Sequence, residues 1–224
     1  MTTAAKKAFH TELQKGDAAT PELFTTVAEL VSIEPPEAVS GMTEVTSHDS
    51  AKGEHIATYV DEGELTARGN WTGAASQTAI RTAQGAAAGN WQICLPDWGQ
   101  RTKTFTAATN DTITATAHGL TTGQPVQVST TTTLPAGLSA STTYYALWLS
   151  ANTFTLHTTN AGAVAGTGTV DITDTGTGTH TLQIGSRFSA AAVVTGYKLD
   201  APLDAAQGIE FRIKVTGAAT LTVD

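Results

Sequence analysis

The chain has 224 residues, of which 40% are hydrophobic and only 14% are charged, a composition typical of a folded protein with a substantial core. Its formal net charge of -8 argues against a surface that binds nucleic-acid phosphates, because such surfaces are basic. The one cysteine, Cys94, excludes an internal disulfide, and its apolar neighbours predict a buried thiol rather than a nucleophile. No segment predicts a signal peptide or a membrane span, so we expect synthesis in the cytoplasm and no membrane partner.

The N-terminal part of the chain predicts short strands. Residues 9–13 indicate a short edge strand, and residues 24–33 carry apolar side chains on both parities, which is typical of a strand between two layers. Strands are also expected over residues 42–46 and 64–71. Residues 47–58 lack apolar periodicity and predict a long polar loop, the kind of segment that is usually functional or mobile.

The hydrophobic period then changes from that of a strand to that of a helix. Within residues 75–88, Ala79, Ile80, Ala83 and Ala87 fall on one stripe, which predicts a helix. A strand follows from Trp91 onward. Because a single amphipathic helix must bury its stripe, we expect this helix to pack on the sheets.

Residues 107–183 differ in composition from the rest of the chain, since they contain no Lys, Arg or Glu. Short strand signals separated by turns predict a small all-β module, with a core supplied by four aromatic residues, Tyr144, Tyr145, Trp148 and Phe154. Two alternatives stay open: the threonine runs indicate disorder, or Trp148 and the two tyrosines form a sugar-stacking surface. The predicted organisation is a core over residues 1–106 and 184–224, interrupted by an inserted module over residues 107–183. We expect this module to tolerate deletion between Ala108 and Gln183.

The clearest strand signals lie at the C-terminus. Residues 209–215 alternate strictly between apolar and charged side chains, which predicts a half-buried strand. Residues 188–199 predict a longer interior strand with a bulge at Gly196, and residues 220–223 predict a hairpin partner for residues 209–215. The predicted fold class is therefore mainly β, a β-sandwich or partly closed barrel with one flanking α-helix, plus a small inserted all-β module.

Outside the insert, the order of several short motifs is similar to that of the major tail tube protein of long-tailed bacteriophages. These motifs are LQKGD (13–17), FTTVAELVSI (24–33), EVTSHDS (44–50), GELTARGNW (63–71) and VTGYKLDAPLD (194–204). None is a catalytic fingerprint, so the resemblance depends on their order along the chain. The insert resembles a β-rich module of phage virion proteins through its AHGL turn (117–120) and TTYY strand (142–145).

The resemblance implies a non-enzymatic structural protein of the virion tail, assembled in the host bacterial cytoplasm. It implies that six copies form a ring and that the rings stack into a tube, with tape measure, tail terminator and tail tip proteins as partners. Double-stranded DNA would pass through the tube without specific binding during ejection into the host. The alternative is a virion surface or fibre-type binding protein whose insert contacts host glycans.

The polar loop supplies the candidate subunit contacts. These candidates are His48, Asp49, Ser50, Lys52, Glu54 and His55. The neighbours His48, Asp49 and Ser50 have the residue types of a hydrolase triad, but sequence neighbours do not converge as a triad requires, so a contact loop or a solvated loop is favoured. The insert histidines His118, His157 and His180 lack metal-ligand spacing and are expected in turns or at the surface, so no metal, cofactor or catalytic residue is predicted.

Charge predicts which residues line the bore of a tube. Three of the 20 acidic residues lie in the insert, so the rest of the chain carries 17 acidic against 12 basic residues. A conduit for DNA must not attract phosphate, so we expect part of this excess to face inward. The candidate lumen-facing residues are Asp61, Glu62, Glu64 and Glu210. The alternative is that they pair with Arg68, Arg212 and Lys214 between subunits.

Overall fold

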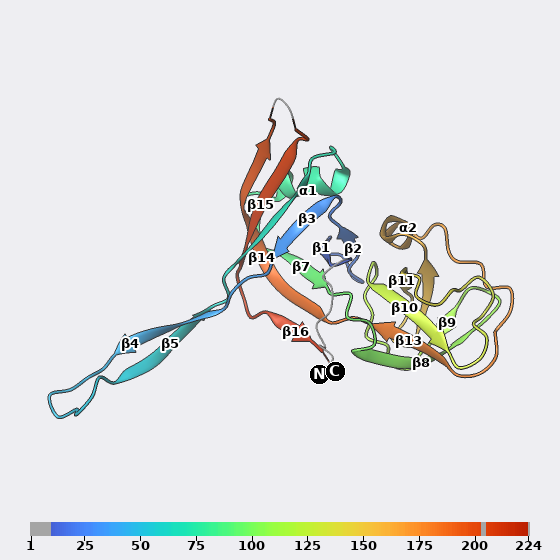
Figure 1. The fold of residues 1–224 in the computed structure, drawn as a ribbon, viewed down its shortest axis with the longest axis horizontal. Coiled ribbons are helices and arrows are strands. Elements are labelled where there is room, and N and C mark those ends of the chain that lie inside the picture. Colours follow the sequence, from blue (N-terminus) through green and yellow to red (C-terminus); the bar gives the residue numbers. More distant parts are fainter. Residues whose placement is uncertain (1–9, 203–204, 224) are drawn as a thin grey trace. The chain divides into compact units, whose positions relative to one another are not determined.

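The computed structural model describes residues 10–202 and 205–223 and is mainly β. It contains an eight-stranded antiparallel sheet, a closed six-stranded barrel, a separate two-stranded sheet and two short helices (Figure 1). The mainly β fold class with an additional β module is thereby confirmed. The chain divides into two compact units, described in turn below. The barrel unit comprises Met1–Val27, Gly89–Ser189 and Thr220–Asp224, and the arm unit comprises Ala28–Ala88 and Ala190–Ala219.

The barrel closes through antiparallel pairing in the order β10-β11-β12-β9-β8-β13, with β13 returning to β10. Its strands are β8 (Arg101–Ala107), β9 (Ile113–Thr114), β10 (Pro125–Thr130), β11 (Tyr144–Trp148), β12 (Thr153–His157) and β13 (His180–Ile184). Closure leaves no free edge in this sheet. The threonine runs pair with each other, because Thr133 and Thr177 exchange backbone hydrogen bonds of 3.1 and 2.9 Å.

Side-chain alternation separates the four aromatic residues expected in the core. Tyr144 and Phe154 are buried inside the barrel together with apolar side chains from its other strands. Tyr145 is the next residue along β11 and faces the opposite side, where its hydroxyl donates to a Glu12 carboxylate oxygen at 2.5 Å. Trp148 is half-buried. The core interpretation therefore holds for two of the four residues.

The insert also contains a helix, so the expectation of an all-β module was wrong in this detail. Helix α2 (Asn160–Ala165) begins after Thr159, whose side chain accepts a hydrogen bond from the Gly162 amide, and ends at Gly166 with φ of 66°. These are the usual N-terminal cap and left-handed stop. The helix is six residues long, so it is too short to give a periodic signal in the sequence.

The three insert histidines are buried, not on the surface. His118 and His157 are fully buried and His180 is 5% exposed. Both nitrogens of each ring make a hydrogen bond to a backbone or side-chain group. His118 Nδ1 accepts from the Leu120 amide at 3.0 Å, so its Nε2 carries the proton and donates to the Ser150 carbonyl at 2.9 Å. Burial lowers the pKa of His118. In a charged ring Nδ1 would also carry a hydrogen, which would point at the Leu120 N–H and replace the hydrogen bond with a repulsive contact.

The lowered pKa of His118 predicts acid sensitivity. Below about pH 6.5, this histidine is protonated in the unfolded chain but still neutral in the folded chain. The free energy of unfolding therefore falls as the pH drops from 6.5 toward the folded pKa. The slope from one such group is at most about 1.4 kcal/mol per pH unit. Thermal unfolding followed by circular dichroism between neutral pH and pH 5 should show this loss.

His118→Gln should lower the unfolding midpoint at every pH and reduce its dependence on pH in this window. His48→Gln is the matched control, since His48 is exposed, and it should behave as wild type. An unchanged pH dependence in His118→Gln would contradict the assignment.

Strands β1 (Glu12–Gly16), β2 (Phe24–Thr26), β7 (Gly89–Cys94) and β16 (Thr220–Thr222) of the barrel unit lie outside the closed barrel. Strand β1 pairs with both β2 and β7, so the expected edge strand at the N-terminus is an interior one. The expected continuous strand over residues 24–33 is broken, because Glu29 has a φ of 58° and separates β2 from β3 (Leu30–Glu34). Burial raises the pKa of the Cys94 thiol, in agreement with its expected inert role.

Strand β16 (Thr220–Thr222) departs from the expected hairpin. It pairs with the first residues of β14 (Arg187–Asp200), with Phe188 opposite Leu221, and not with residues 209–215. Leu221 and Val223 are more than half exposed. A period-two pattern predicts a strand but not its partner, which is why the sequence assigned the wrong neighbour.

A buried polar network joins the barrel to β1 and β2. The Gly123 carbonyl accepts from Gln14 Nε2 at 2.8 Å and from Asn160 Nδ2 at 2.9 Å. Asn160 also donates to the Phe24 carbonyl and accepts from the Thr26 amide, both at 2.9 Å. Gln14 is fully buried and Asn160 is 9% exposed. Since buried groups that lose their partners are costly, the insert is fixed to its host strands.

These contacts revise the expectation that the insert is removable. Deleting Ala108 to Gln183 removes the Gly123 and Asn160 ends of the network, so Gln14 loses the Gly123 carbonyl, and Phe24 and Thr26 lose Asn160. We now expect that deletion to destabilise β1 and β2.

Asn160→Ala tests the network without removing the insert. It should lower the free energy of unfolding by about 1–3 kcal/mol, because the Phe24 carbonyl and the Thr26 amide lose a partner. Hydrogen exchange should show faster exchange of the Thr26 amide. The matched control is Asn110→Ala, at an exposed turn, and it should have little effect. Equal effects of the two substitutions would refute the account.

The arm unit contains four paired strands in the order β14-β15-β6-β3, with β6 at Glu64–Asn70 and β15 at Gly208–Val215. The alternation predicted for β15 is confirmed, since Ile209, Phe211 and Ile213 are at most 2% exposed and their charged neighbours are not buried. The bulge predicted near Gly196 is also confirmed, because the β14–β15 register shifts between Val194 and Gly196.

Helix α1 (Ala75–Ala83) is shorter than the predicted 75–88. Gln84 is extended and Gly85 has a φ of 76°, so the chain leaves the helix before the last alanines. Of the predicted stripe, only Ile80 is fully buried. Gln77 was not predicted and is also fully buried, and its Nε2 donates to the Ala28 and Asn70 carbonyls at 3.0 and 2.7 Å. This amide fixes the helix to the end of β6.

Candidate functional site

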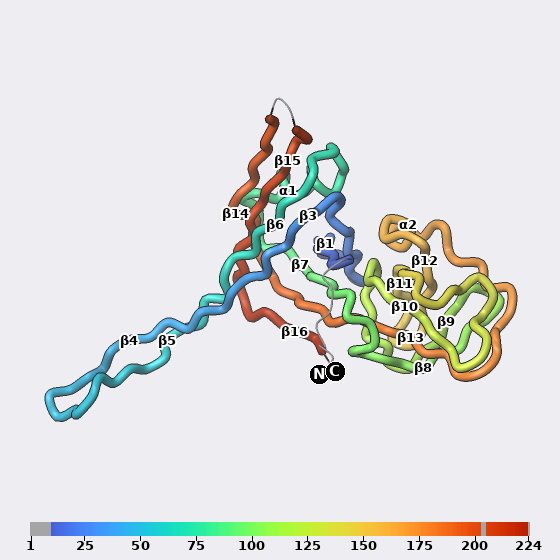
Figure 2. The backbone as a smooth tube through the Cα atoms, in the orientation of Figure 1, coloured from blue at the N-terminus to red at the C-terminus, as the bar shows by residue number. Residues whose placement is uncertain are grey.

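The arm is a β-hairpin formed by β4 (Val39–Glu44) and β5 (His55–Asp61), which pair only with each other. It extends away from the four paired strands of its own unit (Figures 1 and 2). The register shifts between Ser40 and Met42. A Cβ on Gly41 would lie 2.6 Å from the Thr58 hydroxyl and 3.2 Å from the Tyr59 ring, so a larger residue there would require the side chains of these two bulged residues to shift.

The arm exposes apolar side chains on both faces. Every residue of its two strands is exposed except Gly41 and Asp61, which are half-buried. Met42 lies opposite Ala57, and Thr43 lies opposite Ile56, so Met42 and Ile56 are on opposite faces. The large apolar residues at least 43% exposed are Val39, Met42, Val45, Ile56, Tyr59 and Val60. A lone two-stranded hairpin is marginally stable in water, and exposed apolar clusters of this kind mark interaction surfaces.

The structure places the predicted contact residues at the end of the arm. His48, Asp49, Ser50, Lys52 and Glu54 occupy the connection between the strands, and His55 is the first residue of β5. The tip is held by the Ser47 amide donating to Ser50 Oγ at 3.1 Å and the Glu54 amide donating to Thr46 Oγ1 at 2.9 Å.

Among the described residues, no hydrogen bond joins His48, Asp49 and Ser50 to one another, so they do not form a triad. The strand expected over residues 42–46 overlaps β4, but sequence reasoning missed β5, because it assigned residues 55–58 to the polar loop. Its apolar residues Ile56, Tyr59 and Val60 were the available signal.

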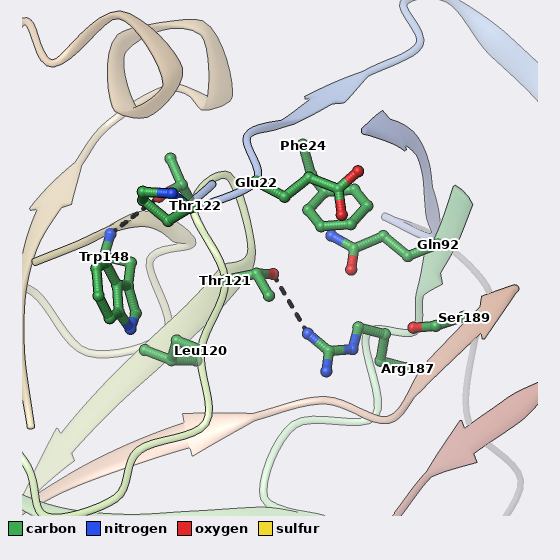
Figure 3. A pocket seen from close by; sticks show the side chains of 10 residues that line it. Glu22, Phe24, Gln92, Leu120, Thr121, Thr122, Trp148, Arg187 and Ser189 are labelled. Carbon is green, nitrogen blue, oxygen red and sulfur yellow. Dashed lines mark hydrogen bonds between the residues drawn. The ribbon is translucent and has the colours of Figure 1, made fainter. Parts of the chain in front are cut away.

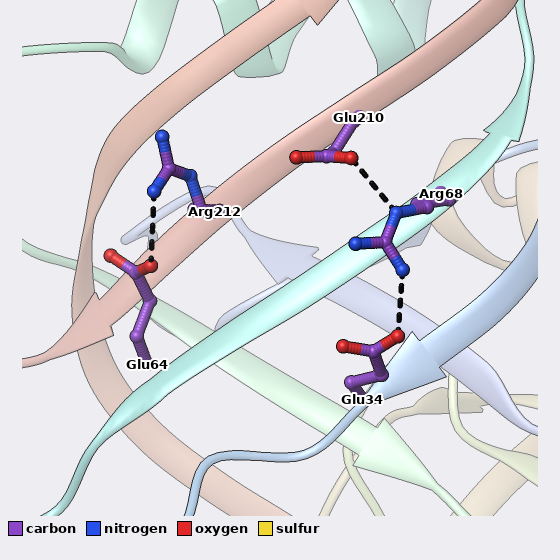
Figure 4. Close-up of polar contacts among 5 residues, drawn as sticks. All are labelled: Glu34, Glu64, Arg68, Glu210 and Arg212. Atoms are coloured by element: carbon purple, nitrogen blue, oxygen red, sulfur yellow. Dashed lines mark hydrogen bonds and ion pairs between the residues drawn. The ribbon is translucent and has the colours of Figure 1, made fainter.

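Two of the predicted lumen residues, Glu64 and Glu210, lie on the charged face of the arm-unit sheet (Figure 4), whereas Asp61 ends β5 and Glu62 follows it. Arg68 donates to Glu34 at 2.7 Å and to Glu210 at 2.8 Å, and Arg212 lies 3.8 Å from Glu64. Lys214 pairs with Asp61.

These pairs shift the pKa values of their members in the expected directions. Hydrogen bonds from Lys214 and from the Gly63 amide lower the pKa of Asp61, and the bond from Arg68 lowers the pKa of Glu210. The two carboxylates raise the pKa of Arg68. All of these side chains are at least 34% exposed to solvent, so the pairs contribute little to folding stability.

The pairs therefore form within one chain. Lys198 lies opposite Glu210 in the ladder, so the four carboxylates Glu34, Asp61, Glu64 and Glu210 face the four cations Lys198, Arg68, Arg212 and Lys214. Glu62, the remaining candidate, has no ion pair among the described residues. The face is polar but locally neutral.

Two hollows accompany these surfaces. A crevice of about 500 Å³ lies at the base of the arm, lined by Tyr59 to Glu62 and by Val215 to Ala218. A smaller cavity of about 250 Å³ lies within the barrel unit, with Trp148 and Arg187 in its lining (Figure 3).

No group of three or more metal-ligating side chains is found among the described residues. No helix in the described part of the chain is long and apolar enough to cross a membrane.

No protein-family model matches the chain, and the comparison with curated proteins gave no match. Among solved structures, it is similar to a chain from the tail of an empty GTA particle with C6 symmetry, at 10% identity and a TM-score of 0.49, covering 98% of this chain and 100% of that one. A chain from the virion of a native gene transfer agent particle gives 10% identity, a TM-score of 0.48 and the same coverage.

A third similar chain comes from the baseplate of an anti-feeding prophage in a 6-fold symmetrised structure. It gives 8% identity and a TM-score of 0.44, covering 100% of this chain and 98% of that one. At these identities and TM-scores, the similarity assigns this chain neither a family nor a function.

Proposed function

We propose that the chain is a structural subunit that assembles with copies of itself into stacked rings, forming the tail tube of a phage-like particle. The observation that carries the proposal is the arm, whose strands bury almost nothing within the chain, and which exposes six large apolar side chains, five of them in the strands. An ordered hairpin of this composition needs a covering surface.

A second copy of the chain is the proposed cover. Because β4 and β5 pair only with each other, each has one free edge that can pair with a strand of another chain. The crevice at the base of the arm, where Tyr59, Val60 and Val215 lie, offers an apolar surface to a neighbour. The ordered motifs that resemble tail tube proteins favour the same occupant and imply six copies per ring.

The remaining parts of the proposal follow from the tail tube resemblance. The tube would belong to the tail of the particle, contact tape measure, terminator and tip proteins, and let double-stranded DNA pass without specific binding. We further propose that the charged face with Asp61, Glu64 and Glu210, together with Glu62, lines the bore. Its support is that charged side chains extend across several strands while the opposite parity of β15 is buried.

Assembly of purified protein tests the proposal. Wild type should form rings or tubes visible by electron microscopy at high concentration. Met42→Ser combined with Ile56→Ser should abolish assembly while leaving the folded content unchanged, because both side chains are exposed and lie on opposite faces of the arm. Leu149→Ser, at an exposed apolar residue of the barrel unit, is the matched control and should still assemble.

A wild-type chain that stays monomeric, even with tail tip and tape measure partners present, would sink the proposal. Normal assembly of the double variant would show that the arm is not part of the contact between subunits.

The lumen assignment has its own test. Glu62→Lys adds a cation without breaking an ion pair among the described residues, so particles with this variant should assemble but eject DNA more slowly. The effect should disappear at high salt, where charges are screened. Asp171→Lys in the insert, an exposed position, is the control and should eject normally. Equal ejection by both variants at low salt would exclude Glu62 from the bore.

One observation favours the second candidate function, a virion surface or fibre-type protein that binds glycans. Trp148 is not in the barrel core and lines a cavity with polar side chains. A protein of that kind would bind its ligand without forming rings or tubes, so the assembly experiment separates the two functions.

A further inference from the structure

The barrel unit contains a cavity that the proposed tube does not use. It has a volume of about 250 Å³, slightly below the usual range for small-molecule sites, and therefore suits a ligand of about one ring. Its apolar lining comes from Pro21, Phe24, Leu120 and Trp148. In Figure 3 Trp148 and Leu120 lie on one side, and Gln92, Arg187 and Ser189 lie on the other.

Arg187 gives the cavity a cation without a counterion. Its Nη1 donates to Thr121 Oγ1 at 3.3 Å and to Gln124 Oε1 at 3.1 Å, both neutral acceptors. Its Nε is buried without a partner, and no carboxylate pairs with it among the described residues. Burial lowers its pKa, and the nearby Arg101 lowers it further. A buried charge normally has an opposite charge beside it, so this guanidinium favours an anionic ligand group.

A second buried polar side chain also reaches the cavity. Gln92 is 1% exposed, and its Nε2 donates to Gln14 Oε1 at 2.5 Å. The side-chain carbonyl oxygen of Gln92 accepts no hydrogen bond from the described residues, so it can accept one from a ligand hydroxyl. Glu22 lies at another side of the cavity, where Asn90 holds both of its carboxylate oxygens at 3.0 and 2.8 Å.

We propose that this cavity binds an acidic monosaccharide unit, a pyranose ring that carries a carboxylate. The ligand carboxylate lies against the Arg187 guanidinium, and the apolar face of the sugar ring packs on Trp148. The sugar hydroxyls donate to the side-chain carbonyl of Gln92 and to the Glu22 carboxylate. This assignment does not depend on tube assembly.

Three features favour this ligand over other anions. A single unpaired guanidinium matches one carboxylate better than a multiply charged phosphate group. Glu22 would repel an anion that filled the whole cavity, but it accepts hydroxyl donors. The aromatic ring of Trp148 and the side chain of Leu120 add an apolar surface, which a small inorganic ion would not use.

Isothermal titration calorimetry on the full chain tests the proposal. Glucuronate should bind saturably over the millimolar range, while glucose, which lacks the carboxylate, and sulfate, which lacks the ring, should bind at least about tenfold more weakly. Arg187→Gln should reduce glucuronate affinity by at least about tenfold. Arg81→Gln, at an exposed arginine of the arm unit, is the matched control and should bind as wild type.

A second measurement does not depend on the folding of the Arg187 variant. Glucuronate should change the tryptophan fluorescence of wild type and of Trp71→Phe, but not that of Trp148→Phe. A uronate oligosaccharide is titrated in a separate experiment. If it binds more tightly than free glucuronate, the natural source of the ligand is a polysaccharide.

The proposal is overturned if glucuronate gives neither heat nor a fluorescence change. It is equally overturned if sulfate or glucose binds as well as glucuronate, or if a folded Arg187→Gln variant keeps wild-type affinity.

Discussion

The carbonyl oxygen of Gly123 accepts hydrogen bonds from Gln14 and from Asn160, and the barrel unit depends on this junction. A Cβ at position 123 would lie 2.0 Å from the Phe24 carbonyl oxygen, and the φ of this residue is 89°, so only glycine allows the close approach. The insert therefore reaches β1 and β2 through buried polar bonds rather than through a flexible linker. An inserted module attached in this way stabilises its host strands and restricts their movement.

The sequence predicted those elements whose signal is local. Strict alternation defined β15, because a half-buried strand needs one apolar parity, and Gly196 marked the bulge in β14. Pairings between distant segments were not predictable. The partner of β16, the closure of the barrel and the contact of Asn160 with Phe24 join residues far apart in the chain, and no local period encodes them.

The candidate site was predictable to a similar extent. Polar composition identified the tip of the arm, but the same composition gave no sign that the adjoining strands leave their apolar side chains uncovered. Alternation in a strand says that two faces differ, not that either face is buried, and Met42 and Ile56 are exposed on opposite faces. Parity also placed Glu64 and Glu210 on a charged strand face, whereas the partners Arg212 and Arg68 in the same chain became known only from the register.

The arm and the charged face place different constraints on assembly. An arm that contacts a different surface of the next copy makes a heterologous contact, and such a contact yields a ring only if its rotation closes, and otherwise an open filament. Both faces of the arm are apolar and both edges are free, so the arm itself does not select between these outcomes. The ion pairs of Arg68, Arg212 and Lys214 are satisfied within the chain and leave little charge to direct a neighbour. In the proposed ring, closure would then depend on the fit of a neighbouring copy at the arm base, where the bulge opposite Gly41 and the crevice beside Val215 lie.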